Sequence, residues 1–251
     1  TPISISEELS QIPGLVAFEK GGAGGGSYVS IRGGEPNFAL VVINGVRVDD
    51  PLNSSGGGFD YSLIDPAIVQ RVSIVSGPTS TAYGADALSG VVSIETGLDD
   101  IGNSAGVHAA VGSNGRFTLG GHAGLTGRAG RIALAVGRSD SNDLQPGSTT
   151  RRLTTLLTAN PNLGRFASLN LFALYAESQS EGFPEDSGGP ELAALPLLEQ
   201  RDREQLALGG TLAVAIAPTI TGQLRLGYSR NNFDAVSPGI ASGVLNGIPA
   251  I

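Results

Sequence analysis

The second half of the chain alternates apolar and polar positions with a period of two residues, which predicts a series of β-strands. Over residues 205–217, for example, Leu206, Leu208 and Leu212 fall on one face of the expected strand, and Gln205 and Thr211 fall on the other. We expect seven such strands, at residues 105–111, 117–125, 131–138, 153–159, 167–175, 205–217 and 220–230.

The connections between these strands alternate between short and long. Tight turns are expected at residues 127–130, 160–164 and 217–219, and long polar connections at residues 139–150, 178–204 and 231–251. This alternation is typical of a transmembrane β-barrel with short turns on one side and long loops on the other. A soluble β-sandwich also alternates apolar and polar residues, but regular alternation of loop length is not expected of it.

The first 97 residues follow a different pattern, with short strands, a helical turn and glycine-rich loops. Strands are expected at residues 28–31, 38–43, 71–74 and 91–96, and Asn44-Gly45 is a strong hairpin-turn dipeptide. A helical turn is expected from Pro78 to Gly84, and a short helix ends before Pro13-Gly14. Gly90 allows two backbones to approach closely. The pattern predicts a mixed α/β domain.

The composition argues against an ordinary soluble enzyme. The 251 residues include 38 glycines, only 15% are charged, and cysteine, methionine and tryptophan are absent. A net charge of −8 argues against broad nucleic-acid binding. No apolar run approaches the roughly 18 residues that a transmembrane helix needs.

Candidate catalytic and metal-binding groups are few. His108 and His122 lie on the small, polar faces of their expected strands, which favours lumen-facing residues over metal ligands or bases. The acidic pairs at residues 49–50 and 99–100 lack the spacing of a calcium loop. The loop at residues 21–27 lacks the Gly-Lys-Ser/Thr ending of a phosphate-binding loop. We therefore expect no enzyme activity, no cofactor and no metal site.

Three motifs occur in a recognisable order: SIRGG at residues 30–34, VVINGVRVDD at residues 41–50, and VQRVSIVSGPTSTAYGADALSGVVSI at residues 69–94. Together they resemble the plug domain of TonB-dependent outer-membrane receptors, with the vitamin B12 (cobalamin) and siderophore receptors most similar. The resemblance implies a mixed α/β plug domain at residues 1–97, followed at residues 98–251 by antiparallel transmembrane β-barrel strands. Barrels of this family have about 22 strands, so about seven strands indicate an incomplete, truncated barrel.

The resemblance also implies a function, a location and partners. We expect energised uptake of a scarce ligand, either a ferric siderophore or cobalamin, across the cell outer membrane. The expected partners are the TonB complex of the inner membrane, outer-membrane lipid and the small-molecule ligand, with no nucleic acid. The segment that binds TonB is expected to precede Thr1. The alternative is a non-transporting β-rich outer-surface or adhesion protein.

Two glycine-rich plug loops, at residues 19–28 and 50–60, are expected to face the ligand, because in the resembling receptors they rise toward the outer face. Exposed backbone groups at glycine and serine can contact a bulky ligand there. The motif SIRGG implies that Arg32 pairs with carboxylates on the inner wall of the barrel. The expected ligand-binding residues are Lys20, Gly21, Ser27, Tyr28, Asp50, Leu52, Asn53 and Ser54.

Overall fold

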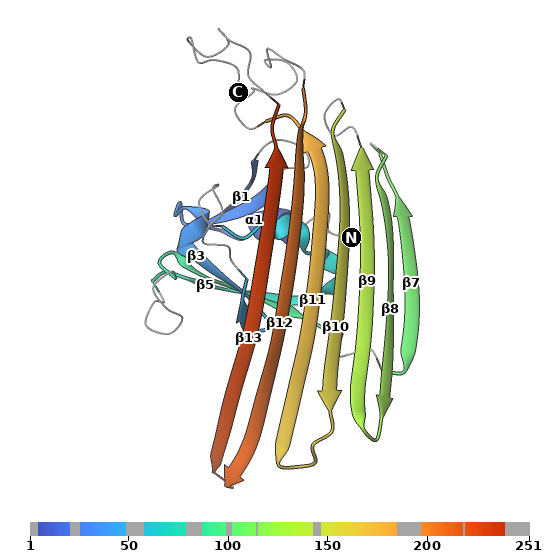
Figure 1. Cartoon of the computed structure of the whole chain (residues 1–251). Helices are drawn as coiled ribbons and strands as arrows, with labels where there is room; N and C mark the ends of the chain where they lie inside the picture. The colour runs from blue at the N-terminus through green and yellow to red at the C-terminus, as the bar shows by residue number, and fades with distance from the viewer. Residues whose placement is uncertain are drawn as a thin grey trace.

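In the computed structural model the chain folds into a small N-terminal α/β unit and a tall sheet of long strands (Figure 1). The structure describes residues 5–20, 26–48, 58–78, 87–98, 102–113, 115–142, 147–184, 197–217 and 219–238. In these ranges, the helices are all too short or too polar to cross a membrane.

Seven long strands pair in sequence order to form one sheet, which we call the wall. Every neighbouring pair is antiparallel, so the chain runs up and down across the wall. The seven predicted strands and their order are confirmed. The strands are β7 (Ser104–Val111), β8 (Phe117–Gly127), β9 (Gly130–Asn142), β10 (Thr149–Pro161), β11 (Ala167–Gly182), β12 (Glu199–Ala217) and β13 (Ile220–Val236).

Several wall strands extend further toward the long connections than the sequence pattern predicts. β11 continues to Gly182, whereas the pattern predicted its end at Tyr175, and β12 begins at Glu199 instead of Gln205. The added residues are largely polar on both faces, so the apolar alternation stops before the strand does. The ladder of hydrogen bonds depends on the backbone and continues past the apolar band.

The two faces of the wall differ in burial. Along β9, Ala133 and Ala135 face inward and are buried, whereas Leu134 and Val136 face outward and are exposed. The outward face of the other strands carries further exposed apolar side chains, including Leu125, Leu157, Leu171, Leu208, Leu224 and Leu226. An exposed apolar face of this extent indicates contact with an apolar environment.

The N-terminal unit, which we call the plug, contains two small sheets and one short helix. Its four-stranded sheet has the order β4-β3-β6-β5, with β3 parallel to β6 and the other pairs antiparallel. A separate hairpin of β1 and β2 packs against α1. The elements are α1 (Ile5–Ser10), β1 (Leu15–Lys20), β2 (Gly26–Ile31), η1 (Pro36–Phe38), β3 (Ala39–Ile43), β4 (Val46–Arg47), η2 (Tyr61–Leu63), η3 (Pro66–Ile68), β5 (Val69–Ser76) and β6 (Gly90–Thr96).

The mixed α/β character of this unit is confirmed, but several elements differ from the expected ones: β2 begins at Gly26 rather than Tyr28, and β5 spans Val69–Ser76 rather than residues 71–74. Strand β1 was not predicted, because its short sequence lies between a helix end and a glycine-rich loop and is recognisable only through its pairing with β2. Phe38 ends the 3₁₀ turn η1, so β3 begins one residue later than expected. The helical turn predicted from Pro78 to Gly84 lies outside the described residues beyond Pro78.

The predicted hairpin turn between β3 and β4 is confirmed. Asn44 and Gly45 have φ angles of 49° and 80°, and positive φ at both positions is the geometry of a type I′ turn. The Asn44 side chain also fastens the turn to the end of β6: its Nδ2 donates to Thr96 Oγ1 at 2.6 Å, and its Oδ1 accepts from the Thr96 N–H at 2.9 Å. The Asn44 side chain therefore ties the β3–β4 turn to the end of β6.

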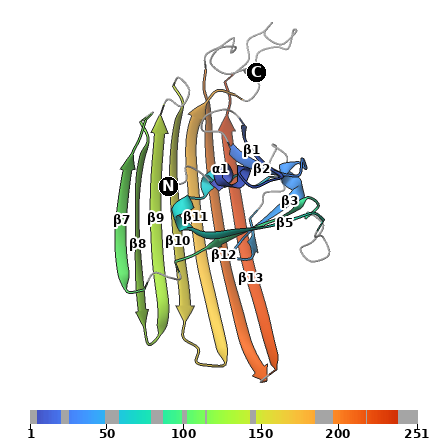
Figure 2. The ribbon, with the colours of Figure 1, turned by 180° about the vertical axis from the view of Figure 1, so that it is seen from behind.

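The plug lies against the inner face of the wall, over β11, β12 and β13 (Figure 2). One hydrophobic cluster spans both parts. It joins plug residues such as Ile43 and Ile94 to wall residues such as Leu156 and Leu174, all of them fully buried at 0% exposure. The wall and the plug therefore share a core.

Replacement of Gly90 by Ala tests the close approach predicted there. Gly90 has a φ of 152°, and a Cβ atom would clash with the carbonyl oxygen of Val75 on the neighbouring strand β5. We expect Gly90→Ala to destabilise the β5–β6 pair by about 2 kcal/mol, measured by faster hydrogen exchange of the β6 amides. Ser89→Ala is the control, because the Ser89 hydroxyl has no hydrogen-bond partner among the described residues. Equal exchange rates in both variants would contradict the prediction.

Candidate functional site

The plug is fixed to the wall by a patch on β12 and β13 that we call the plug seat. It consists of Gln205 and Gly209 on β12 and of Arg225, Gly227 and Asn231 on β13. Gln205 is the register partner of Asn231, and Gly209 is the register partner of Gly227. Because register partners point to the same face of a sheet, the patch is continuous and faces the β3–β4 hairpin.

Val46 of β4 fits into a notch between the two glycines of the plug seat. A Cβ atom at Gly209 or at Gly227 would lie 2.6 Å from Val46 Cγ2, closer than real carbon atoms approach. Both positions must therefore be glycine for Val46 to fit. Val46 is 5% exposed, and burial of a valine side chain contributes about 1.5–3 kcal/mol. Beside the notch, the Arg225 guanidinium lies over Gly45 of the hairpin turn.

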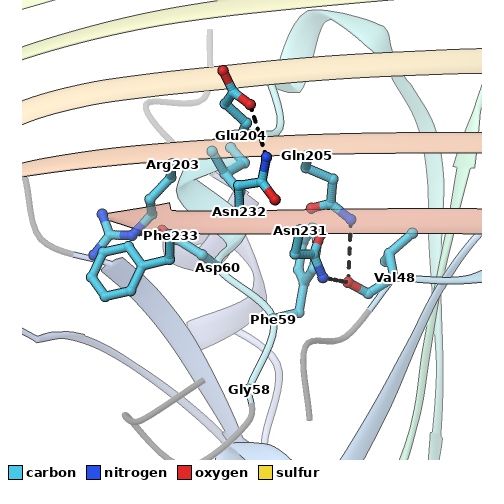
Figure 3. A pocket seen from close by; sticks show the side chains of 11 residues that line it. Val48, Gly58, Phe59, Asp60, Arg203, Glu204, Gln205, Asn231, Asn232 and Phe233 are labelled. Atoms are coloured by element: carbon cyan, nitrogen blue, oxygen red, sulfur yellow. Dashed lines mark hydrogen bonds and ion pairs between the residues drawn. The ribbon is translucent and has the colours of Figure 1, made fainter. Parts of the chain in front are cut away.

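The carbonyl oxygen of Val48 accepts two hydrogen bonds from the plug seat (Figure 3). Gln205 Nε2 donates at 3.2 Å, and Asn231 Nδ2 donates at 3.3 Å. Gln205 is 1% exposed and Val48 is 0% exposed. A carbonyl oxygen has two lone pairs, so the two amides satisfy this buried acceptor completely. Together with the notch, they define the position of the hairpin along the wall.

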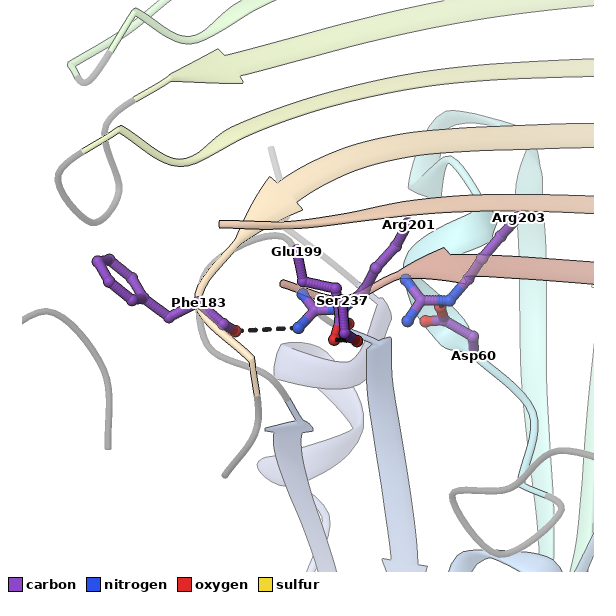
Figure 4. Close-up of polar contacts among 6 residues, drawn as sticks. All are labelled: Asp60, Phe183, Glu199, Arg201, Arg203 and Ser237. Carbon is purple, nitrogen blue, oxygen red and sulfur yellow. Dashed lines mark hydrogen bonds and ion pairs between the residues drawn. The ribbon is translucent and has the colours of Figure 1, made fainter. Parts of the chain in front are cut away.

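Asp60 joins two parts of the plug to the wall (Figures 3 and 4). Asp60 is the N-cap residue of η2, and its Oδ1 accepts from the N–H of Ser62 at 2.9 Å. The same oxygen accepts from the N–H of Ser27 in β2 at 2.8 Å. Its Oδ2 lies 3.4 Å from Arg203 Nε on β12, and these two side chains are 5% and 11% exposed. The Arg203 guanidinium also lies 4.9 Å from the ring centroid of Phe233. A buried pair of this kind leaves a costly uncompensated charge when one partner is removed.

Arg201 ties the wall strands together at the end where their connections are long (Figure 4). Its Nη2 donates to the carbonyl oxygen of Phe183 at 3.0 Å, and its Nε pairs with Glu199. The other carboxylate oxygen of Glu199 accepts from the Ser237 hydroxyl. These contacts connect the ends of β11, β12 and β13 directly beside Arg203.

A cavity of about 30 Å³ lies between the plug and the wall, beside Asp60 and Val48 (Figure 3). One water molecule needs roughly 10–15 Å³ of such volume, so the cavity has room for about two. Among the described residues, Asp60 Oδ2, Arg203 Nη1 and Asn231 Oδ1 have no hydrogen-bond partner. This cavity therefore has no room for a solute much larger than water.

The structure describes the side chains of only two predicted ligand-binding residues, Ser27 and Tyr28. They are 3% and 2% exposed, and the Ser27 hydroxyl donates to Ser6 Oγ at 2.5 Å inside the plug. Direct ligand contact by either residue stays a prediction. Of Lys20 only the backbone at the end of β1 is described, and the others lie outside the described residues: Gly21, Asp50, Leu52, Asn53 and Ser54.

Tyr28 brings together the bases of the two predicted ligand loops. Gly26 lies in the first predicted loop and Gly58 in the second, each directly after residues that the structure does not describe. A Cβ atom would lie 2.7 Å from Tyr28 Oη at Gly26 and 3.1 Å from Tyr28 Cδ1 at Gly58. Gly26 and Gly58 therefore both lie against the same aromatic ring.

Arg32 lies at an exposed turn after β2, with a φ of 52°. Its N–H donates to the carbonyl oxygen of Gly14 at 2.7 Å, and no described residue forms an ion pair with its side chain. The predicted contact of Arg32 with the barrel stays a prediction. The contact that the structure does describe has the opposite polarity, with the acid Asp60 on the plug and the base Arg203 on the wall.

The two histidines lie on the inner face of β7 and β8, as the sequence predicts. His108 is the register partner of Gly120 and His122 that of Gly106, and each ring lies over its glycine partner. Within the described ranges, no three histidine, aspartate or glutamate side chains are placed to hold a metal ion.

Sequence reasoning did not identify the plug seat. The available signal was the presence of glycines inside otherwise regular strands, since such a glycine often marks the close approach of another segment. Gly209 and Gly227 follow this rule, but Gly210 lies on the outward face and has no such contact with the plug. The partner of each glycine became apparent only from the register of β12 with β13 and from the placement of the plug.

Comparison with known proteins agrees with this architecture. Residues 2–91 match the family model of the TonB-dependent receptor plug domain. The chain is similar to the copper transporter OprC (17% identity, TM-score 0.62), covering 98% of this chain and 45% of that one. It is also similar to the unliganded ferric citrate transporter FecA (16% identity, TM-score 0.73), covering 96% of this chain and 38% of that one. A third similar structure is the pyoverdine-bound outer membrane receptor FpvA from Pseudomonas aeruginosa PAO1 (15% identity, TM-score 0.74), covering 92% of this chain and 35% of that one.

A plug fixed to the inner face of an antiparallel wall with an apolar outer face defines a plugged β-barrel protein. The match of residues 2–91 and the three structural similarities confirm the resemblance in the sequence motifs. Residues 2–91 are a plug domain of the TonB-dependent receptor type, the chain shares the fold of the three solved structures named above, and it spans less than half of their length.

Asp60→Asn tests the ion pair between plug and wall. Asparagine keeps an oxygen that can accept from Ser27 and Ser62, but it leaves Arg203 buried without a counter-charge. We expect a loss of about 3 kcal/mol, seen as roughly 100-fold faster exchange of the η2 amides.

Arg71→Gln provides the matched control for that variant. The ion pair of Arg71 with Glu95 is exposed, with side-chain exposures of 66% and 39%, so its loss is expected to cost less than about 1 kcal/mol. If Asp60→Asn costs no more than Arg71→Gln, the ion pair with Arg203 does not hold the plug.

Proposed function

We propose that this chain forms the plug and part of the barrel of an outer-membrane receptor that imports a scarce ligand, with energy supplied by the TonB complex of the inner membrane. The observation that carries the proposal is the seating of the plug on the inner face of the wall through buried, specific contacts. A plug held in this way closes a barrel at rest, so import requires these contacts to break.

The outward face of the wall supports a location in the outer membrane. Its exposed leucines and valines suit the hydrocarbon region of a lipid bilayer, and polar residues dominate toward the long connections. Outer-membrane lipid is therefore the proposed partner of this face.

We further propose that the ligand is a metal chelate, with a ferric siderophore favoured over cobalamin. Support comes from the names of similar structures, which include a ferric citrate transporter and a receptor bound to pyoverdine. The cavity at the plug seat holds about 30 Å³, far less than a drug-sized ligand requires, so import needs movement of the plug.

An uptake panel tests the proposed function in cells that depend on this receptor. The panel contains 55Fe-labelled citrate, hydroxamate and catecholate chelates, 57Co-labelled cobalamin and 64Cu²⁺, each measured with and without a functional TonB complex. We expect TonB-dependent accumulation of at least one ferric chelate, and recovery of the receptor in the outer-membrane fraction. Recovery in the soluble fraction, or equal accumulation without TonB, would refute the proposal.

The two glycine-rich loops are the proposed ligand site, because they share a base at Tyr28. We expect the double replacement Lys20→Ala and Asn53→Ala to weaken binding of the imported chelate about tenfold, which corresponds to about 1.4 kcal/mol. Titration calorimetry on the purified receptor measures this change. Leu208→Ala, on the outward face of β12, is the control and should leave the affinity unchanged. Equal affinities of the double variant and the control would exclude these loops as the site.

A further inference from the structure

We propose that the outward face of the wall carries a binding site for one phospholipid, with an acyl chain in a groove across β8, β9, β10 and β11 and the phosphate at Arg128. This inference rests on the proposed function, which places the outward face in the outer membrane. It assigns the class of lipid, the leaflet from which the lipid comes and the residues that hold it.

A groove of about 590 Å³ lies on the outward face near the short turns. This volume falls within the range of roughly 300–1,000 Å³ that is typical of small-molecule sites. Leu125, Ile132, Ala159 and Leu171 line the groove and follow one another as register partners across the four strands. Ala159 is the one small residue in this row, so the surface is lowered between Ile132 and Leu171.

The next row toward the short turns has even less side-chain volume. Gly127 and Gly130 are register partners, Pro161 is the partner of Gly130, and all three line the groove. A Cβ atom at Gly127 would meet no other atom within 4 Å, so the groove is open there. A hydrocarbon chain needs no hydrogen-bond partner and suits a floor formed by Ala159 and Gly127.

The charges on the described part of the wall differ between its two ends. The acids all lie in the half near the long connections: Asp140, Glu177, Glu181, Glu199, Asp202, Glu204 and Asp234. The charged residues described in the half near the short turns are Arg128, Arg131, Arg165 and Arg225. This end of the described wall therefore carries positive charge without acids, which attracts the phosphate of a lipid headgroup.

Arg128 lies at the open end of the groove. It is exposed in the turn between β8 and β9, and its two neighbours, Gly127 and Ala129, both line the groove. The turn is held in place, because Asn162 Nδ2 in the adjacent short turn donates to the carbonyl oxygen of Arg128 at 3.2 Å. No described acid forms an ion pair with the Arg128 guanidinium. A guanidinium offers phosphate a planar fork of N–H donors, so this residue selects a phospholipid over a neutral lipid.

The second short turn indicates that Arg128 lies at the depth of the headgroups. Both turns are at the lower end of the wall in Figure 1. Phe166 in the second turn is 60% exposed, and the Arg165 guanidinium lies 4.6 Å from the centroid of its ring. Exposed aromatic residues mark the bilayer interface in membrane barrels, and short turns face the periplasm. The lipid is therefore a phospholipid of the periplasmic leaflet.

Native mass spectrometry of the whole receptor tests the groove. The receptor, purified in detergent, is titrated with dioleoyl phosphatidylglycerol, and the affinity for the first bound lipid is measured. Ala159→Phe fills the groove, and we expect it to weaken binding of this lipid about tenfold. Ala173→Phe is the matched control, because Ala173 is the register partner of the outward residues Leu157 and Leu208 but does not line the groove. Equal affinities in the two variants would overturn the proposal.

Arg128→Gln tests the phosphate contact. We expect about fivefold weaker binding of phosphatidylglycerol, since an arginine near a membrane surface contributes attraction of this order. Arg151→Gln is the control, because Arg151 is exposed at the opposite end of β10, where its register partner is Asp140. Dioleoylglycerol, with the same chains and no phosphate, should bind the unmodified receptor and Arg128→Gln equally weakly. If Arg128→Gln behaves as Arg151→Gln does, or if dioleoylglycerol binds as tightly as phosphatidylglycerol, the phosphate site is wrong.

The same spectra detect the alternative occupant, a second copy of the receptor. A dimer that is lost in Ala159→Phe, with unchanged affinity for phosphatidylglycerol, would overturn the lipid site. Folding of each variant is checked by heat-modifiable gel mobility. If Ala159→Phe does not fold, Gly127→Leu fills the same groove from the open side of β8 and replaces it in the comparison.

The outcome is distinguishable from that of the uptake panel. Failure of uptake would refute import without changing the number or affinity of lipids on the purified receptor. Equal lipid binding by Ala159→Phe and Ala173→Phe would refute the groove even in a receptor that imports a ferric chelate.

Discussion

The fit of Val46 between two glycines is the constraint on which the arrangement of plug and wall depends. Gly209 and Gly227 are register partners, so the notch exists only when β12 and β13 pair in this register. A slip of β13 by one residue would turn Gly227 to the outward face and bring a large apolar neighbour, Leu226 or Tyr228, inward. The alternation of side chains between the two faces of the wall therefore also forms the seat, because the same strands supply both.

Polar and apolar contacts have different roles in this interface. The shared core of plug and wall supplies adhesion that depends little on direction, since apolar burial scales with area. The bonds of Val48 with Gln205 and Asn231, and of Asp60 with Arg203, require particular distances and so fix the position of the plug.

The order of elements could be read from the sequence because it depends on local pattern and turn chemistry. Asn44-Gly45 predicted a hairpin, Gly90 predicted a close approach, and the period of two predicted every wall strand. The ends of the strands were misjudged, because polar residues continue the backbone ladder without the apolar signal. The second role of Asn44, its two bonds with Thr96, depends on a residue far along the chain and no local pattern indicates it.

The partners across the interface could not be predicted for a related reason. Arg32 was expected to contact the barrel, from a motif shared with the family, and that contact stays a prediction. The ion pair that the structure describes is a different one, with the arginine on the wall at residue 203. An ion pair between two parts of a chain needs an acid on one surface and a base on the other, and either surface can carry the acid. The two charged groups must become buried together, because a buried charge without its partner is strongly destabilising. A search for buried acids at a 3₁₀ turn beside inward-facing arginines would therefore find this contact where a motif does not.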